Sequence, residues 1–295
     1  MTEIFGIPIQ AFLGQLLLGL VNGSFYAVLS LGLAVIFGLL NIINFAHGAL
    51  YMMGAFLTWM GLQYLGINYW FMLILAPIVV GLFGIVMERL LLKHLYKLDH
   101  LYGLLLTFGL AMLIEGLFRS LYGVSGQPYN APAALQGALN LGFMFLPVYR
   151  GWVVVASLIV CFATWFVIEK TRLGALLRAG TENPKLVEAF GVNVPLVVTL
   201  TYGFGVGLAG FAGVLAAPVL QVSPLMGSNL IIVVFAVVVI GGMGSILGSI
   251  VTGLGLGVIE GLTKVFWPQA SNTVVFIIMV IVLLLRPAGL FGKEK

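Results

Sequence analysis

Long apolar runs, separated by short polar or charged segments, fill almost the whole sequence. We expect nine helical segments, at about 10–38, 46–65, 69–92, 100–122, 149–169, 196–218, 229–241, 246–264 and 272–287. Most approach the length of about 20 residues that crosses a bilayer as a helix. Several are short and rich in glycine, which favours half-spans that turn back. The pattern predicts an all-α fold, a polytopic transmembrane helical bundle with about eight to ten membrane segments, some of them short or interrupted.

The distribution of charge agrees with a membrane protein. No Asp, Glu, Lys or Arg lies between Glu3 and Glu88, or between Glu188 and Glu260. Of the 295 residues 62% are hydrophobic and 7% are charged, and the mean hydropathy is +1.19. The net charge of +4 gives no reason to expect nucleic-acid binding, because the basic residues cluster where membrane loops must lie. We expect one transmembrane domain over residues 1–295, in contact with membrane lipid and with no separable soluble domain.

The positions of Lys and Arg predict the orientation, because cytoplasmic loops are enriched in both. They fall in the 88–100 loop (Arg89, Lys93, Lys97), in the loop at about 170–195 (Lys170, Arg172, Arg178, Lys185) and in the tail (Lys293, Lys295). The loop at about 123–148 has neither residue type and should face the outside. Nine crossings would place the N-terminus outside, and one crossing fewer would reverse it. The first span lacks the basic region and cleavage site of a secretory signal, so we expect it to be retained.

Polar residues within the apolar runs are candidates for a translocation path, because unpaired polar groups are costly in lipid. The first group is Asn22, Ser24, Asn41, Asn44, His47 and Gly48. Asn41, Asn44 and His47 recur every third residue, which places them near one helical face if the helix continues. Such side chains either join helices to one another or line a path, and the sequence leaves both open. For His47 a structural hydrogen bond is favoured over a proton relay.

The second group lies in a glycine-rich stretch, residues 239–261. Gly244 and Gly248 are four apart, as are Gly253 and Gly257, a spacing typical of close helix crossings. A break at Gly241 and Gly242 would free backbone amides inside the protein, as in transporters that must hold and release a substrate. The candidate path residues here are Gly241, Gly242 and Ser245.

The remaining chemistry is sparse. Glu115 and Arg119 are four apart, as are Glu260 and Lys264, so each pair is either a helix-surface ion pair or a contact for an external partner. No phosphate-binding GxxxxGK[ST], GxSxG or HExxH motif occurs, so neither ATP hydrolysis nor another enzymatic activity is expected of this chain. The three histidines form no group in sequence, and no metal site is expected. The single cysteine, Cys161, is expected to be a small core residue.

One charged segment interrupts the apolar pattern. Seven charged residues fall between Glu169 and Glu188, a stretch that includes TENPKLVE. Asn183 can cap a helix that starts at Pro184, and Gly191 can close it. Leu186, Val187 and Phe190 fall within one arc, with Lys185 and Glu188 pointing away. Two helical turns are unstable alone, so this helix must dock on lipid headgroups, on the protein's own helix ends or on another protein.

Four ordered stretches resemble a known family over essentially the full length. They are NGSFYAVLSLGLAVIFGLLNIINFAHGALYMMGAF, RAGTENPKLVEAFGVNV, VIGGMGSILGSIVTGLGLGVIEG and LLLRPAGLFG. The family is that of the membrane permease subunits of branched-chain amino-acid ABC importers, of the H-type. The resemblance implies half of a translocation path in the bacterial inner membrane. It also implies a second homologous permease, two cytoplasmic ATPase subunits that use ATP and Mg, and a periplasmic substrate-binding protein as partners.

The resemblance also gives the charged segment a role as the helix that couples to the ATPase. The residues concerned are Thr181, Glu182, Asn183, Pro184, Lys185, Leu186, Val187, Glu188, Phe190 and Gly191. The importer signature of Glu-Ala-Ala followed by a spaced Gly is only loosely met, because Phe190 and Gly191 follow Glu188-Ala189 directly. Leucine, isoleucine and valine are the expected substrates, although similar permeases import urea, short amides or aromatic acids. An ion-coupled secondary transporter and a membrane-embedded enzyme are the competing readings of the sequence.

Overall fold

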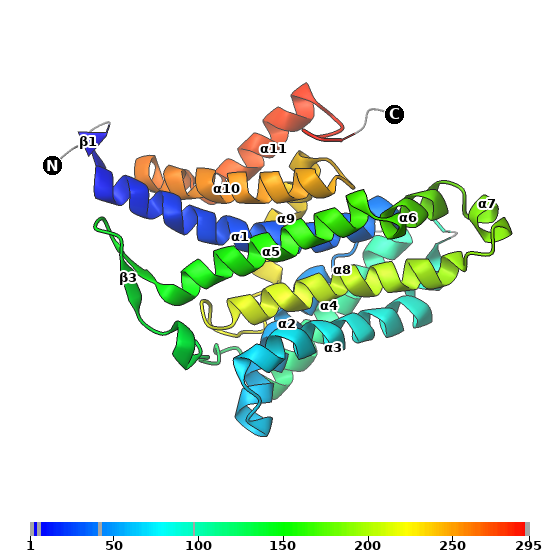
Figure 1. Ribbon diagram of the computed structural model, residues 1–295, viewed down its shortest axis with the longest axis horizontal. Coiled ribbons are helices and arrows are strands. Elements are labelled where there is room, and N and C mark those ends of the chain that lie inside the picture. The colour runs from blue at the N-terminus through cyan, green and yellow to red at the C-terminus, as the bar shows by residue number, and fades with distance from the viewer. Residues whose placement is uncertain (1–2, 5–6, 41–42, 97, 293–295) are drawn as a thin grey trace. The chain divides into compact units, whose positions relative to one another are not determined.

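The computed structural model describes residues 3–4, 7–40, 43–96 and 98–292. Within this part of the chain, every segment predicted to be helical is a helix (Figure 1). These are α1 (Ile9–Leu40), α2 (His47–Leu65), α3 (Tyr69–Leu90), α4 (His100–Tyr122), α5 (Val148–Lys170), α8 (Val194–Ala216), α9 (Ser228–Gly241), α10 (Ile246–Phe266) and α11 (Val274–Leu285). Two helices that the apolar pattern does not mark as spans, α6 (Arg172–Glu182) and α7 (Pro184–Ala189), lie between α5 and α8.

Short elements fill the connections. The 3-10 helices are η1 (Leu92–Leu95), η2 (Ala133–Leu135) and η3 (Pro268–Ala270). The strands β1 (Glu3–Ile4) and β2 (Ile7–Pro8) form one antiparallel pair, and β3 (Ala138–Asn140) and β4 (Phe145–Pro147) form another. In the second pair Leu139 lies opposite Leu146. This hairpin belongs to the loop that is predicted to face the outside.

Among the described residues, six helices are long and apolar enough to cross a bilayer. They are α1, α3, α4, α5, α8 and α10, whereas α9 and α11 are shorter apolar helices. The prediction of a polytopic helical membrane protein with short helices among its segments is therefore confirmed. The side of the membrane on which each terminus lies stays a prediction.

The chain divides into two compact units. The first comprises Met1–Ser30, Ala131–Cys161 and Val233–Lys295, and the second comprises Leu31–Asn130 and Phe162–Ile232. Each unit is assembled from segments that are distant in sequence, because the chain passes from one to the other within α1, α5 and α9 and in the loop between Asn130 and Ala131. One membrane domain over the whole chain stays a prediction.

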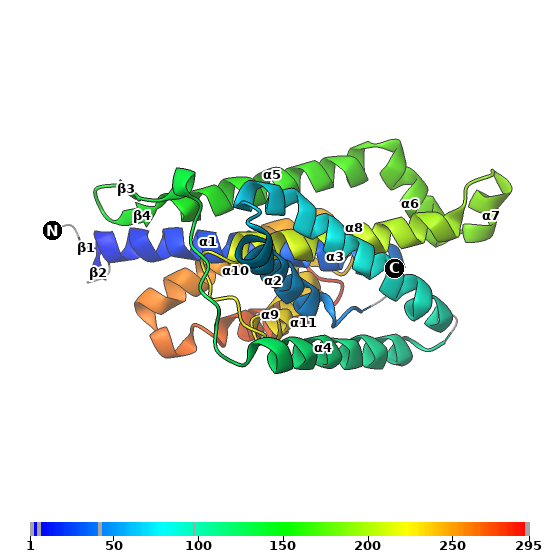
Figure 2. The same cartoon turned by 90° about the horizontal axis from the view of Figure 1, so that it is seen from below.

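Helix α8 is the centre of the second unit and packs on α2 and α3. Figures 1 and 2 show α3 and α8 side by side, and Figure 2 shows α2 nearly end-on, so α2 crosses them steeply. Glycines make these contacts close: a Cβ on Gly81 would lie 2.9 Å from the carbonyl oxygen of Gly203, and a Cβ on Gly54 would overlap Gly210. The positions of these helices are therefore set by contact between backbones, as in small-residue helix crossings in membranes.

In the first unit α1 and α10 pack in the same way. A Cβ on Gly23 would lie 2.8 Å from the carbonyl oxygen of Leu254, and one on Gly253 would lie 2.7 Å from the Cα atom of Ala27. The close crossing predicted from Gly253 and Gly257 is thus confirmed. The same prediction is wrong for Gly244, which has φ 88° and lies in the turn between α9 and α10.

The predicted break at Gly241 and Gly242 is confirmed. Helix α9 ends at Gly241, and Gly242 has φ 101°. The C-terminal stretch completes this helix end, because the amides of Leu290 and Phe291 donate to the carbonyl oxygens of Ile240 and Gly241 at 2.8 and 3.1 Å. The break frees carbonyls at the end of α9 as well as the predicted amides, at the start of α10. The RPAGLFG motif satisfies two of the carbonyls, and Ser245 accepts from the amide of Gly248.

Candidate functional site

The charged segment begins where α6 folds back against the end of α5. A Cβ on Gly174 would overlap the backbone of Ile168, so a larger residue cannot occupy this position without a shift. Arg178 Nη1 donates to the carbonyl oxygen of Ile168 at 2.7 Å and lies 3.7 Å from Glu169 Oε2. The apolar pattern did not predict α6, although Leu173 and Leu176 among its polar residues are a helical signal.

Helix α7 has the start and end that the sequence predicts. Asn183 Oδ1 accepts from the amide of Leu186 at 3.2 Å, and Pro184 occupies the first turn. Beyond its other end Gly191 has φ 81°, a conformation that favours glycine. The predicted cap, first-turn proline and closing glycine are confirmed.

The apolar residues of this segment do not share one surface. Val187 is buried, with 8% of its surface exposed, whereas Leu186 is 54% and Phe190 79% exposed. The prediction of a single docking stripe is therefore wrong in part: Val187 holds the helix on its own protein, and the other two apolar side chains stay open. The charged members Glu182, Lys185 and Glu188 are also exposed. The backbone of Thr181 belongs to α6, and its side chain lies outside the described part.

A buried carboxylate lies at the end of α3 that is predicted to be cytoplasmic. Glu88 is only 2% exposed and accepts hydrogen bonds from Tyr96 Oη at 2.5 Å and from Thr199 Oγ1 at 2.8 Å. Burial, together with the hydrogen bond and charge of Glu88, raises the pKa of Tyr96 well above its ordinary value. These bonds tie α3 to α8 and to the loop after α3. In the sequence Glu88 marks only the end of an uncharged run, so this role was not predicted.

The polar residues predicted for a path have different surroundings. Ser24 donates to Leu20 within its own helix at 2.9 Å, and Asn22 is half-buried. Asn41 lies outside the described residues. His47 is fully buried as the first residue of α2. Gly241 and Gly242 lie at the break described above, and Ser245 caps α10 by accepting from the amide of Gly248 at 3.1 Å.

The helical face expected for Asn44 and His47 is not formed. Helix α1 ends at Leu40 and α2 starts at His47, so Asn44 lies between helices. Its Oδ1 accepts from the amide of Ala46 at 3.1 Å, while Nδ2 has no partner within the described part of the chain. Asn44 therefore lies in a buried turn that precedes α2, and not on a helical face shared with His47.

The break between α8 and α9 lies against the break between α1 and α2. The chain leaves α8 at Ala216 and starts α9 at Ser228, and Gly227 is in backbone contact with Gly48. The starts of α2 and α9 therefore lie against each other. Discontinuous helices with adjoining ends are typical of substrate sites in transporters.

A carboxylate from α4 lies at the same place. The hydroxyl of Ser228 donates to Glu115 Oε2, and Glu115 forms no ion pair with Arg119 among the described residues. The predicted helix-surface pair is therefore wrong for Glu115, whereas Lys264 does pair with Glu260, at 2.6 Å. A small cavity of about 80 Å³ adjoins this hydrogen bond. Its lining is Phe45, Gly48, Ala49, Phe108, Ala111, Met112, Glu115, Pro224, Ser228 and Ile231.

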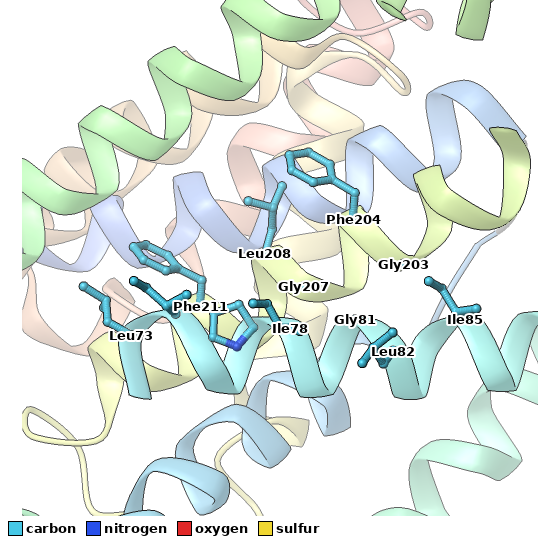
Figure 3. Close-up of a pocket in the computed structure, with 12 residues that line it drawn as sticks. Leu73, Ile78, Gly81, Leu82, Ile85, Gly203, Phe204, Gly207, Leu208 and Phe211 are labelled. Carbon is cyan, nitrogen blue, oxygen red and sulfur yellow. The ribbon is translucent and has the colours of Figure 1, made fainter. Parts of the chain in front are cut away.

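A larger groove of about 430 Å³ runs between α3 and α8 and has an entirely different character (Figure 3). Its lining is Leu73, Ile74, Pro77, Ile78, Gly81, Leu82, Ile85, Gly203, Phe204, Gly207, Leu208 and Phe211. Every one of these residues is apolar, so the groove offers no partner for a charged or hydrogen-bonding solute. In a membrane protein such a surface suits lipid chains or another helix. The smaller cavity is the better candidate for binding a polar substrate.

Sequence comparison identifies the family. The model of the family described as "Branched-chain amino acid transport system / permease component" matches residues 15–284. The chain belongs to this family. No solved structure matches it.

Named relatives of this branched-chain amino acid permease agree with that assignment. The high-affinity branched-chain amino acid transport system permease protein BraD of Pseudomonas aeruginosa is 30% identical, over 97% of this chain and 98% of its own length. LivH of Salmonella typhimurium, with the same description, is 28% identical over 96% of each chain. LivM of the same organism is 26% identical over 92% of this chain and 68% of its own length. All three are permeases, and the chain is a multi-pass membrane permease component.

The permease thus has two candidate functional regions on the second unit. One is the exposed α6–α7 segment, and the other is the cavity at the adjoining starts of α2 and α9. Among the described residues no group of three or more His, Cys, Asp or Glu side chains is arranged to hold a metal ion. Of the path candidates predicted from the sequence, Gly48 lies in the second region. Glu115 and Ser228 also lie there, although the sequence did not predict either of them as a path residue.

Proposed function

We propose that this permease is the H-type membrane half of an ATP-driven importer for leucine, isoleucine and valine in a bacterial inner membrane. The names of BraD and LivH support the substrate class. Two permeases of one organism, LivH and LivM, are both similar to this chain, which supports pairing with a second homologous permease. Two cytoplasmic ATPase subunits would use ATP and Mg, and a periplasmic protein would deliver the substrate. This chain would itself hydrolyse nothing.

The observation that carries the proposal is the exposed end of α7. A short helix that is capped at its start by Asn183, and held by Val187, leaves Leu186 and Phe190 uncovered. Large exposed aromatic side chains at a membrane protein's aqueous end are typical of protein contacts. Lys185 and Glu188, which carry opposite charges, border these apolar side chains, whereas docking on lipid headgroups would favour basic residues alone. We therefore assign this surface to an ATPase subunit.

The connection from α7 to the membrane helices supports a mechanism of rigid transmission. Asn193 Oδ1 caps α8 by accepting from the amide of Leu196 at 3.1 Å, only a few residues after α7 ends. Helix α8 is in turn fixed to α2 and α3 by glycine contacts. Closure of the ATPases would displace α7, tilt α8 and so move α2 against the start of α9. This change would open the cavity to one side of the membrane and then to the other.

Charge-reversing and polar variants of the exposed surface test the coupling. We expect Glu188→Lys and Phe190→Asp to assemble normally but to abolish leucine uptake while ATP hydrolysis continues, because neither side chain supports the fold. Leu139→Asp, which also replaces an exposed apolar residue, but in the β3–β4 hairpin, serves as the matched control and should retain uptake. Normal uptake by correctly assembled Glu188→Lys and Phe190→Asp complexes would overturn the coupling role. Uptake of urea, a short amide or an aromatic acid in place of leucine would reassign the substrate alone.

A further inference from the structure

The cavity beside Glu115 combines a carboxylate with an apolar lining at the starts of two helices. We propose that it is the subsite in which this permease holds its amino-acid substrate during transit, with Glu115 binding the ammonium group and the apolar residues enclosing the side chain. The inference rests on the proposed function and deepens it by naming the residues that recognise the substrate.

The carboxylate of Glu115 lies at a costly position and keeps free acceptor capacity. Glu115 lies within a helix long and apolar enough to cross the bilayer, where an acidic side chain is costly unless it has a partner. Arg119, one turn away on the same helix, is not that partner, and the Ser228 hydroxyl occupies one acceptor position. A carboxylate has about four such positions, so several remain for the N–H groups of an ammonium ion. Neighbouring Met112 and Phe108 are 62% and 50% exposed, so the cavity is accessible from the surface of α4.

The backbone beside the cavity suits the other charge of an amino acid. Gly48 and Ala49 line the cavity and belong to the first turn of α2, whose amides have no acceptor within the helix. A carboxylate at this end is stabilised by such N–H groups and by the helix dipole. The buried Asn44 Nδ2, which has no partner among the described residues, lies in the turn that precedes the same helix. The cavity thus lies between a carboxylate on α4 and the first turn of α2, which is the arrangement that a zwitterion requires.

The lining of the cavity suits an aliphatic side chain. The cavity of about 80 Å³ exceeds the ~15 Å³ that one water molecule needs, so it can admit a small apolar group. Phe45, Phe108, Ala111, Met112 and Ile231 supply the apolar surface. Valine, leucine and isoleucine fit this description. Urea would leave the apolar lining unused.

Uptake by the complete complex tests the inference. The permease is reconstituted in lipid vesicles with its partner permease, ATPases and binding protein, and radiolabelled leucine uptake is measured beside ATP hydrolysis. We expect Glu115→Gln to lower uptake about tenfold or more, because a charged hydrogen bond to the substrate is lost. Hydrolysis stimulated by the leucine-loaded binding protein should stay within about twofold of the unaltered complex, since the coupling surface is intact. Arg119→Gln, on the same helix but outside the cavity, is the matched control and should retain both activities.

The outcomes separate this inference from the proposed function. Leucine uptake by Glu115→Gln within about twofold of the unaltered complex would overturn the inference and leave the proposed function standing. Absence of ATP-dependent leucine uptake by the unaltered complex would overturn both. If Glu115→Gln fails to assemble, Ala111→Phe fills the cavity without altering the carboxylate. Assembled Ala111→Phe complexes should lose leucine uptake several-fold, and unchanged uptake would overturn the inference.

Discussion

Helices α7 and α8 follow each other in the chain but are held in place by opposite means. The surface of α8 carries glycines that bring its backbone against α2 and α3, so each contact leaves no space for even one methyl group. Helix α7 has six residues, is capped by Asn183 and buries Val187, while Leu186 and Phe190 stay exposed. A helix of this length is unstable without a surface to dock on. The difference teaches that backbone contacts fix α8 within the permease, whereas α7 keeps an apolar surface uncovered, as the proposed coupling role requires.

The largest expected effect comes from disrupting the glycine contacts of α8. Gly54→Ala would place a Cβ atom against the backbone of Gly210 and should destabilise the permease by about 1–3 kcal/mol, because backbone cannot move aside as a side chain can. The matched control is Gly109→Ala in α4, where an added Cβ meets nothing within 4 Å. That change should be neutral or stabilising by up to about 1 kcal/mol. Thermal unfolding in detergent measures both variants, and equal shifts would contradict the role given to glycine packing.

A second variant tests the polar link between α3 and α8. Glu88→Ala removes the acceptor of the Tyr96 and Thr199 hydroxyls and should cost about 1–3 kcal/mol, since it leaves buried donors without their partner. Glu169→Ala is the control, because its contact with Arg178 is long and partly exposed, and such pairs contribute at most about 1 kcal/mol. The same thermal measurement applies. A Glu169→Ala loss as large as that of Glu88→Ala would show that burial does not decide the effect.

The smallest expected effect comes from removing the N-terminal cap of α7. Asn183→Ala removes the cap and should destabilise α7 locally by about 1 kcal/mol, which corresponds to about fivefold faster hydrogen exchange at the amide of Leu186. Amides of α8 should be unaffected, because Asn193 caps that helix separately. Lys185→Ala, on the exposed side of α7, is the control. Faster exchange throughout α8 in Asn183→Ala would mean that the two helices are not independently stabilised.

Apolar periodicity and helix-end residues were sufficient to predict much of this structure. Runs without charge predicted the membrane helices, and Asn183, Pro184 and Gly191 predicted α7, because both signals act between neighbours in sequence. The break after Gly241 was also predicted, whereas its completion by Leu290 and Phe291 was not. That contact depends on the return of a distant segment, which no local pattern encodes.

The candidate sites were less predictable for the same reason. The four-residue spacing predicted an ion pair between Glu115 and Arg119. The carboxylate of Glu115 instead accepts a hydrogen bond from Ser228, 113 residues further along the chain. Leu186, Val187 and Phe190 share an arc by periodicity, yet tertiary packing covers only Val187. Helix geometry shows which residues lie near one another on the same helix. Only the tertiary fold determines which of these residues another segment covers.

Leucine uptake with the proton gradient collapsed and ATP present tests the central claim most directly. It is measured in vesicles that contain the reconstituted complex, with ATP supplied on the side of the ATPases, and isoleucine and valine are compared with leucine. If this permease is half of an ATP-driven importer, uptake of all three persists without the gradient and stops when ATP is withheld. Uptake that follows the proton gradient and is indifferent to ATP would contradict the claim.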